Sequence, residues 1–518
     1  MLGFTRKNKR LKQVVVLSII AICVFGAGYF GGVVSAQTGT TTIEPSSFQE
    51  VASYIIFTDG STVYARNGAT GAIGYSGADA STVIQSAINA LTNGGKIFIK
   101  AGTYTINSQI NVNKTDITLF GEGRSTVIYS SADIIVFYTT ADHIIFQNLL
   151  FKSGHDPEVQ GTNRAIYGYG ATDIKIVDCY ITSDNNTAAW RIAFDFLSCK
   201  NVEISGCVGD GANNVFAGRS CSDFNIHDNM ITSPTDNAMD FGGYNITIRD
   251  NRIYRSTFSG WTGHEASFNG ISITANSYNI VIFGNIISQM DGHAIYIHEN
   301  SYFIVVQKNL VGECGKMTGG EIGIYIKGTS SLHNKKIRVN DNIVYKSGRY
   351  GIVLEYVDYS ECIGNVCVNN GQLDSTRGDG IRVDVATNTV VSGNVCYDDQ
   401  ATKTQTYGIT AVGGSSSNIF VGNNVAGNLI GNMSISSGNI VSENIGFTTE
   451  KRGSATITAG TSVDVTHGLA GTPTIVTVTP RSIGYGAYAV TARNSTTFTI
   501  TVSTSGTYTF DWYAEYKP

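Results

Sequence analysis

The sequence predicts an all-β solenoid built from short parallel strands, and three observations lead to that prediction. One pattern repeats between Asp291 and Asn444, in which an Ile-rich stretch is followed by a second apolar stretch that ends on asparagine. Apolar residues alternate with a period of two inside each unit, which indicates strands and not helices. The 59 glycines stand against 6 prolines, a ratio typical of many tight turns and few missing backbone donors.

The repeated units share an opening strand and a closing asparagine. The opening strands are Ala294–Ile297, Gly323–Ile326, Gly351–Leu354, Gly380–Val383 and Gly408–Ala411. The closing residues are Asn309, Asn342, Asn365, Asn394, Asn424 and Asn444, and earlier units close at Asn148, Cys179, Cys207, Asn229, Asn251 and Asn285. From Asn309 to Asn444 the separations run from 20 to 33 residues, which is the range of solenoid repeats.

Units of this kind are expected to stack, because a strand pair with one apolar face cannot bury that face alone. Stacking places equivalent residues about 4.8 Å apart along the axis. A stacked asparagine can bond the side-chain amides of its neighbours, and it tolerates the backbone of a turn. The closing asparagines are therefore expected to form one column.

The first 36 residues have the layout of an export signal. Five basic residues between Arg6 and Lys12 precede an uncharged run from Val14 to Ala36. Val34–Ala36 suits a signal peptidase, yet the 23 uncharged residues are also long enough to cross a bilayer. A cleaved signal peptide and a retained membrane anchor both remain open for residues 1–36. Either one predicts an extracytoplasmic protein, secreted or anchored to the cell surface, with no other membrane contact.

An amphipathic helix is predicted between a linker and the solenoid. Residues 37–53 are rich in Thr and Ser without periodicity, which indicates an exposed linker. Further on, Asn93–Gly95 forms a helix stop. The apolar positions ahead of it, spaced for one helix face, are Val83, Ile84, Ala87, Ile88 and Leu91. One such helix would cover the open end of a solenoid.

This segment carries a family resemblance. Asp79–Leu91, Gly94–Ile99 and Ala101–Tyr104 together resemble the capping segment of pectate-lyase-superfamily proteins and of phage tail-spike proteins with the same architecture. The resemblance covers roughly Tyr54 to Gly446 and contains no catalytic residue. It implies a right-handed parallel β-helix, placed here at residues 54–449, that acts on acidic or complex polysaccharides. The tail-spike likeness further implies a homotrimer.

The pattern changes near the C-terminus. From Arg452 to Pro518 alternating strands are separated by turns, which predicts a small β-sandwich over residues 450–518. Such a module could bind sugar, join chains or cap the solenoid.

Eight cysteines follow the N-terminal segment, and the repeat register makes stacked neighbours of six of them. The pairs are Cys179 with Cys207, Cys199 with Cys221, and Cys367 with Cys396. In-register parallel neighbours have unfavourable Cβ directions for a disulfide, so reduced thiols are favoured and disulfides remain the alternative. Cys362 is expected in the core and Cys314 in a loop.

Composition and motifs exclude several classes of function. The formal net charge is -5, which makes nucleic acid an unsuitable partner. No His/Cys metal spacing, phosphate loop or Ser-His-Asp triad is present, so no motif indicates a cofactor and no metal ligand is predicted. A divalent cation such as calcium stays an open alternative if the chain is a lyase.

The alternation also predicts which side chains face outward along the opening strands. If Ile295 and Ile297 point inward, Tyr296 and His298 point outward. Outward residues of stacked units are Asp195, Asp240, Ser272, Thr274, Tyr325, Lys327, Val353, Glu355, Arg382 and Asp384. Three loop clusters are expected beside them: His264–Glu265, Asp291–His293 and Arg377–Asp379.

A polysaccharide cleft needs aromatic planes, orienting cations and groups that move protons. The candidate catalytic residues are Asp240, His293, His298 and Glu355, and the candidate substrate-binding residues are Tyr296, Tyr325, Lys327, Arg382 and Asp384. Hydrolysis would use two carboxyls about 5 to 10 Å apart, either Asp195 with Asp240 or Glu355 with Asp384. Lyase or epimerase chemistry on a uronate would use a base near His298 or Tyr296, with Lys327 or Arg382 neutralising the carboxylate.

The known catalytic motifs of related enzymes are matched only in fragments. Thr235–Asn237, Asp291–Ala294 and Gly380–Arg382 are partial echoes of polygalacturonase-like motifs, and His155–Glu158 holds the residues of an alginate-epimerase motif in another order. No catalytic residue is carried over from either family. Two functions stay open: a polysaccharide lyase or hydrolase, and a non-catalytic adhesin or tail-spike-like protein that binds a surface glycan.

Overall fold

The computed structural model describes residues 52–155, 162–184, 190–255, 268–315 and 321–518. The predictions for residues 1–36, for nearly all of the 37–53 linker and for His264–Glu265 lie outside these ranges. Within the ranges, no helix has both the length and the apolar character needed to cross a bilayer.

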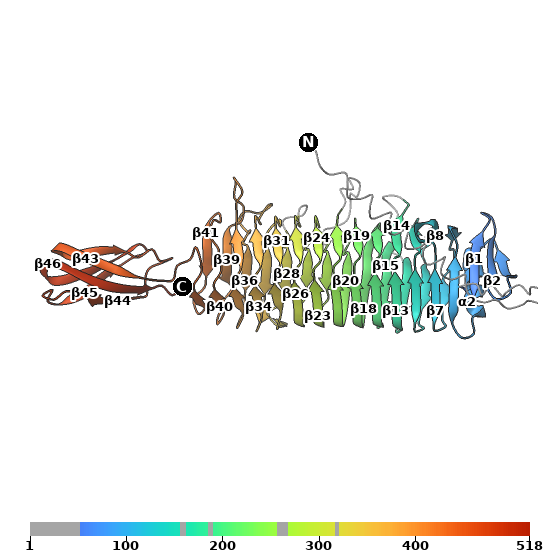
Figure 1. Cartoon of the computed structure of the whole chain (residues 1–518), viewed down its shortest axis with the longest axis horizontal. Helices are drawn as coiled ribbons and strands as arrows, with labels where there is room; N and C mark the ends of the chain where they lie inside the picture. Colours follow the sequence, from blue (N-terminus) through green and yellow to red (C-terminus); the bar gives the residue numbers. More distant parts are fainter. Residues whose placement is uncertain (1–51, 156–161, 185–189, 256–267, 316–320) are drawn as a thin grey trace, which may run out of the picture. The chain divides into compact units, whose positions relative to one another are not determined.

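The described chain winds into coils of three strands each, and equivalent strands of successive coils lie side by side (Figure 1). One coil contains β22 (Ile271–Ile273), β23 (Tyr278–Phe283) and β24 (Ile286–Ser288), and the next contains β25 (Ile295–Ile297), β26 (Tyr302–Gln307) and β27 (Leu310–Gly312). β22 pairs with β25, β23 with β26 and β24 with β27, each in parallel. The predicted parallel β-helix is confirmed.

First and second strands belong to one sheet of 30 strands. The first strands are β6 (Ile110–Val112), β9 (Ile135–Thr139), β12 (Arg164–Tyr169), β15 (Trp190–Leu197), the first halves of β18 (Ala212–His227) and β20 (Met239–Arg249), β22, β25, β28 (Ile324–Lys327), β32 (Ile352–Glu355), β36 (Ile381–Asp384), β39 (Tyr407–Val412) and β41 (Gly431–Ile435). The second strands are β4 (Gly95–Ile99), β7 (Ile117–Phe120), β10 (Ile144–Gln147), β13 (Thr172–Val177), β16 (Lys200–Ser205), the second halves of β18 and β20, β23, β26, β29 (Asn334–Lys335), β30 (Arg338–Asn340), β33 (Val357–Asp358), β34 (Glu361–Ile363), β37 (Val390–Ser392), β40 (Ile419–Val421) and β42 (Ile440–Ser442).

Third strands form a separate sheet of 12 strands. They are β5 (Gly102–Thr105), β8 (Thr126–Ser130), β11 (Leu150–Ser153), β14 (Tyr180–Ser183), β17 (Val208–Asp210), β19 (Met230–Thr232), β21 (Arg252–Tyr254), β24, β27, β31 (Ile343–Tyr345), β35 (Val366–Val368) and β38 (Val395–Tyr397). A short 3-10 turn, η1 (Gly123–Ser125), precedes β8.

The described chain begins with three antiparallel strands and a helix. β1 (Tyr54–Thr58) pairs with β2 (Val63–Asn67), which pairs with β3 (Ile73–Gly77). Helix α2 (Ala80–Ala90) starts after Asp79, whose carboxylate accepts the amides of Ser81 and Thr82, each at 3.2 Å. The α2 residues Val83, Ile84, Ala87 and Ile88 join the core of the solenoid.

A column of buried asparagines runs along the turn between second and third strands. Its members are Asn229, Asn251, Asn285, Asn309, Asn342, Asn365, Asn394, Asn423 and Asn444. The amide N–H and Nδ2 of Asn342 each donate to Oδ1 of Asn365 at 3.0 Å, and Nδ2 also donates to the Val306 carbonyl at 2.9 Å. The predicted ladder is confirmed, and the amides satisfy turn backbone that would otherwise be buried without partners.

The prediction was wrong for two members of the column, Asn424 and Asn148. Asn423 occupies the ladder position and Asn424 is exposed, while Leu149 stands where Asn148 was expected. The residue before each ladder position adopts left-handed backbone, with φ of 53° at Asn148, 55° at Asp341 and 66° at Gly422. Asparagine, aspartate and glycine tolerate that conformation, so an Asn in this turn can fill either of two adjacent positions.

The eight described cysteines are buried, and none forms a disulfide. Cys367 and Cys396 are register partners, and backbone bonds join Val208 to Cys179 and Ser222 to Cys199, so the predicted neighbours are confirmed. Cys314 lies in a loop, as predicted. Its side chain is nevertheless fully buried in the core, which the sequence did not indicate. Burial raises the pKa of Cys199 to about 11 and that of Cys221 to about 12, so both thiols stay protonated.

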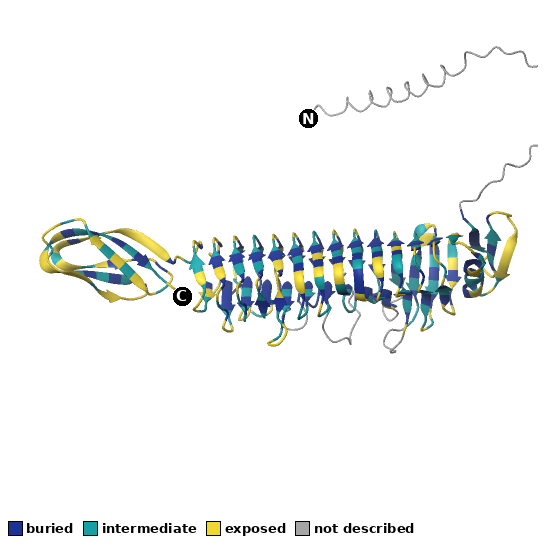
Figure 2. Ribbon diagram, turned by 90° about the horizontal axis from the view of Figure 1, so that it is seen from below, coloured by how far each residue is buried: buried dark blue, intermediate teal, exposed yellow. Residues whose placement is uncertain are grey.

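The last described residues form an antiparallel sheet of four strands: β43 (Glu450–Thr466), β44 (Ile475–Pro480), β45 (Tyr488–Arg493) and β46 (Thr497–Glu515). β46 pairs with β43 over nearly its whole length, and with β44 and β45 through different halves. Buried residues alternate with less buried ones along β46, whereas β43, β44 and β45 are mostly exposed or intermediate (Figure 2). The inward residues, among them Phe498, Phe510 and Trp512, form a core separate from that of the solenoid.

Candidate functional site

The outward residues of the first strands form a column, called here the strip. From coil to coil its members are Tyr138, Tyr167, Asp195, Ala217, Asp240, Ser272, Tyr296, Tyr325, Val353, Arg382, Thr410 and Ser434. Lys327, Glu355 and Asp384 stand in a second column two residues later. The register predicted from the alternation is confirmed.

Aromatic rings of adjacent coils meet in the middle of the strip. The rings of Tyr296 and Tyr325 stack with centroids 5.4 Å apart and planes inclined by 21°. The imidazole of His293 lies 4.9 Å from the first ring and 5.1 Å from the second, and His298 lies 4.1 Å from Tyr296. These side chains therefore form one aromatic cluster across two coils.

His293 lies largely buried in this cluster with both ring nitrogens engaged. Nδ1 accepts the Ile322 amide at 3.0 Å, so the proton of the neutral ring is on Nε2, which faces Glu321 Oε2 at 3.2 Å. Burial lowers the pKa of His293 to about 3. This geometry suits a neutral imidazole that positions the two tyrosine rings.

The neutral state of His293 predicts a loss of stability in acid. The folded pKa is depressed below the ordinary 6.5, so its contribution is complete above pH 6.5 and is lost as the pH falls toward 3. The expected loss reaches up to about 3 kcal/mol by pH 4. His293→Asn keeps an acceptor for the Ile322 amide without titrating, so its urea midpoint should depend less on pH over this interval.

His143→Asn is the control, because that imidazole is 55% exposed on the surface. Equal pH dependence in wild type and in His293→Asn would contradict the assignment of a buried neutral His293.

The carboxylates of the second column, Glu355 and Asp384, are hydrogen-bonded to residues of the strip. Glu355 Oε2 accepts the hydroxyl of Tyr325, and Asp384 Oδ2 accepts Nε and Nη2 of Arg382 at 3.2 and 3.0 Å. The Arg382 guanidinium also lies over the Tyr350 ring, 5.2 Å from its centroid. Both carboxylates are thus held by neighbours, which makes Glu355 with Asp384 a less available catalytic pair.

The two members of the other predicted pair, Asp195 and Asp240, differ in how far they are buried. Asp195 is fully buried between two arginines, with Arg164 Nε at 2.6 Å and Arg219 Nη2 at 3.1 Å from Oδ2. Asp240 is only partly buried, and Ala217 separates the two in the strip. A carboxylate without access to solvent cannot contact a glycan, so the structure leaves Asp240 as the accessible member.

The pKa of Asp240 is raised, chiefly by burial. The negative charges of Asp236 and Asp195 act in the same direction, whereas a hydrogen bond with Ser272 and the charge of Arg219 oppose them. On the far side, Ser272 Oγ lies 3.4 Å from His298 Nε2, and burial lowers the pKa of His298.

Asp236 is a site residue whose role the sequence did not reveal. It is partly exposed and precedes β20, the strand that carries Asp240. Its Oδ2 accepts a hydrogen bond from Asn214 Nδ2 at 3.2 Å, and its Oδ1 accepts one from the Asn237 amide at 2.8 Å. Its only sequence signal was its place in the fragment Thr235–Asn237.

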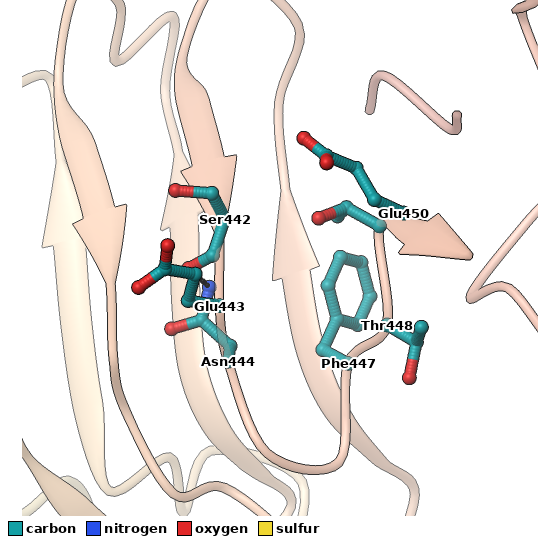
Figure 3. Close-up of a pocket in the computed structure, with 7 residues that line it drawn as sticks. Ser442, Glu443, Asn444, Phe447, Thr448 and Glu450 are labelled. Carbon is teal, nitrogen blue, oxygen red and sulfur yellow. Dashed lines mark hydrogen bonds between the residues drawn. The ribbon is translucent and has the colours of Figure 1, made fainter. Parts of the chain in front are cut away.

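Two further observations concern the surroundings. In the described ranges no group of three or more His, Cys, Asp or Glu side chains could hold a metal ion. A pocket of about 200 Å³ lies at the end of the last coil, away from the predicted site residues (Figure 3). Its lining residues are Ser442, Glu443, Asn444, Phe447, Thr448, Thr449 and Glu450.

Comparison with known proteins supports the architecture. A family model described as right handed beta helix region matches residues 164–366. The Dettilon tailspike protein (gp208) is 13% identical over 84% of this chain and 91% of its own, with a TM-score of 0.54. The Pseudomonas phage phi297 tailspike gp61 is 12% identical over 83% and 91%, with a TM-score of 0.53. A search of curated protein sequences returned no match. These likenesses show a right-handed parallel β-helix.

Proposed function

We propose that this right-handed parallel β-helix protein binds a polysaccharide along the strip and hydrolyses it, with Asp240 as the general acid. The observation that carries the proposal is the strip itself. Aromatic, cationic and carboxylate side chains stand in register on consecutive coils, about 4.8 Å apart. A linear glycan laid along the axis would meet the rings of Tyr296 and Tyr325 and then the guanidinium of Arg382, which are groups of the kinds that line ligand sites.

Asp240 has the property that a general acid needs. Such a group must keep its proton near the working pH, and burial raises the pKa of Asp240 in that direction. The second carboxyl is proposed to be Asp236, which is partly exposed and whose charge acts on Asp240. As in other glycosidases, one carboxyl would protonate the leaving oxygen and the other would activate water or attack the sugar.

The two tyrosines in the middle of the strip, Tyr296 and Tyr325, are poor candidates for the base that lyase or epimerase chemistry needs. Burial raises the pKa of both Tyr296 and Tyr325, so their phenols hold their protons and are poor bases. His298 remains a neutral group within reach of Ser272. We assign to Tyr296, Tyr325, Lys327 and Arg382 the binding of sugar rings and of any acidic groups on them, and to Asp384 the orientation of Arg382.

A non-catalytic glycan-binding protein is the second candidate. It is supported by the internal bonding of Asp195, Glu355 and Asp384, which leaves few carboxylates free for chemistry. In either case an extracytoplasmic location, secreted or anchored through residues 1–36, is part of the proposal, because glycans of this kind lie outside the cytoplasm.

The proposed hydrolysis is tested by identifying the reaction products. The chain is incubated with a panel of uronate-rich and neutral polysaccharides, and new reducing ends and unsaturated sugars are measured separately. Hydrolysis predicts reducing ends without unsaturated products, with turnover at least tenfold above a heat-denatured control. Unsaturated products would contradict hydrolysis in favour of a lyase. Retained binding without any product would leave the non-catalytic function.

A further inference from the structure

The outward face of the C-terminal sheet is hollowed over one half of β46. This feature, called here the terminal hollow, has a volume of about 640 Å³ and is lined by residues on or next to β43, β44 and β46. Phe510, Trp512 and Ala514 of β46 belong to the core of the module. The alternate residues Asp511 and Tyr513 therefore point outward, into the hollow.

The strands on either side of β46 complete the lining. The register forms two rows across the hollow, one of Arg452, Tyr513 and Thr477 and the next of Ser454, Asp511 and Thr479. Directly paired residues of antiparallel strands project from the same face. The hollow therefore presents a phenol ring between a guanidinium and a hydroxyl, beside a carboxylate between two hydroxyls.

The two arginines of the hollow differ in their partners. Arg481 Nε lies 2.6 Å from Asp511 Oδ2, so these two side chains hold each other. The Arg452 side chain is exposed, and within the described part of the chain no hydrogen bond or ion pair engages its guanidinium. Arg452 thus has donors available for a ligand.

Further charges lie near the ring of Tyr513. Burial raises the pKa of Tyr513, and the charges of Glu450 and Glu515 act in the same direction, so the phenol keeps its proton. Glu515 Oε1 in turn pairs with Lys517 Nζ at 3.2 Å. Counted with the arginines and Asp511, three cationic and three anionic side chains surround the hollow, which favours neither an anion nor a cation.

We infer that the terminal hollow is a second saccharide-binding site, separate from the strip, and that it takes a neutral sugar. Tyr513 is partly exposed and offers aromatic surface to a sugar ring. Arg452 can donate to the sugar hydroxyls and Asp511 can accept from them, while Thr477 and Thr479 can do both. A ligand with many hydroxyls and no charge satisfies these groups without repulsion from either set of charges.

The other half of β46 shows that this lining is not a general property of the module. The outward residues there are Thr499 and Thr501, and their register partners on β43 and β45 are Asp464, Ser462, Ala492 and Ala489. Neither an aromatic ring nor a guanidinium stands among these six residues. The combination expected of a sugar site is therefore confined to the hollowed half.

The inference does not rest on the proposed function, because each site can be followed separately in the full chain. Phenylglyoxal, a reagent selective for arginine, is added with and without D-glucose, D-galactose, D-mannose or N-acetyl-D-glucosamine. The modification rate of each arginine is then measured by peptide mass spectrometry. Arg452 reports on the hollow and Arg382 on the strip. Arg493 of β45, which is exposed and does not line the hollow, is the internal reference.

At least one of the neutral sugars should slow the modification of Arg452 and leave the rate at Arg493 unchanged. Tyr513→Thr removes the aromatic contact and keeps strand propensity, so the sugar concentration for half-protection of Arg452 should rise about tenfold. Tyr488→Thr is the matched control, because Tyr488 is 42% exposed on β45 and lies outside the lining. It should leave that concentration unchanged, and circular dichroism should show unchanged strand content in both variants.

The wild-type chain alone can overturn the inference. Arg452 that reacts at the same rate with and without every neutral sugar would do so, as would equal slowing at Arg493. Slowing by D-glucuronate or inorganic phosphate, but by no neutral sugar, would show an anion site instead. A folded Tyr513→Thr variant with wild-type half-protection would also contradict the site. Slowing at Arg382 without slowing at Arg452 would support binding at the strip while overturning the second site.

Discussion

Asp240→Asn is expected to lower turnover of the cleaved polysaccharide by about 10² to 10⁴-fold, the usual contribution of a general acid. The amide has the shape of the carboxyl and can still bond Ser272, but it cannot donate a proton to a leaving oxygen. Because Tyr296, Tyr325, Lys327 and Arg382 stay in place, glycan binding should change less than threefold. Initial rates of reducing-end release, together with a binding isotherm on the same glycan, measure both quantities.

The pH profile separates a catalytic role from a structural one. Since burial raises the pKa of Asp240, activity should fall as the pH rises through that pKa, and this alkaline limb should be absent from the residual activity of Asp240→Asn. Asp250→Asn is the matched control. Asp250 lies in the turn after the strand that carries Asp240, bonds Arg249 at 3.0 Å, and has a φ of 56° that asparagine tolerates.

Full turnover in Asp240→Asn would contradict the assignment of Asp240 as the general acid and would assign that role to another residue. The same loss in Asp250→Asn would show that the effect comes from a disturbed coil and not from a lost proton.

Asn423→Ala should lower the free energy of unfolding by roughly 3 kcal/mol or more, whereas Asn424→Ala should change it by less than about 0.5 kcal/mol. The Asn423 side chain accepts the amide and Nδ2 of Asn394 at 3.0 and 2.9 Å. It also donates to the Val391 carbonyl at 3.0 Å and to Asn444 Oδ1 at 2.9 Å. Alanine would leave these buried groups without partners. The side chain of the exposed Asn424 makes one long contact, from Oδ1 to the Ala426 amide at 3.5 Å.

Urea denaturation of both variants measures the difference, and hydrogen exchange of the Asn394 amide reports whether the last coils open first. The two substitutions are chemically identical and adjacent, so unequal effects can come only from their places in the column. Equal effects would contradict the ladder register at this coil.

Much of the fold, and the set of outward-facing residues, could be predicted from the spacing of apolar residues and asparagines in the sequence. The strict alternation around Ile295 and Ile297 predicted which side chains face outward. The repetition of one unit predicted that these outward residues stack in one column, which includes Asp240, Tyr296, Tyr325 and Arg382.

The sequence by itself determined the repeat, and with it the winding, the register and the identity of stacked neighbours, because strands with a period of two can stack in few ways. Only the tertiary structure decided what depends on distance and burial. It separated Asn423 from Asn424 through the left-handed turn at Gly422, buried Asp195 between two arginines, brought Asp236 into the surroundings of Asp240 and engaged both nitrogens of His293. Those properties come from loops and side chains of different coils, whose approach no local pattern records.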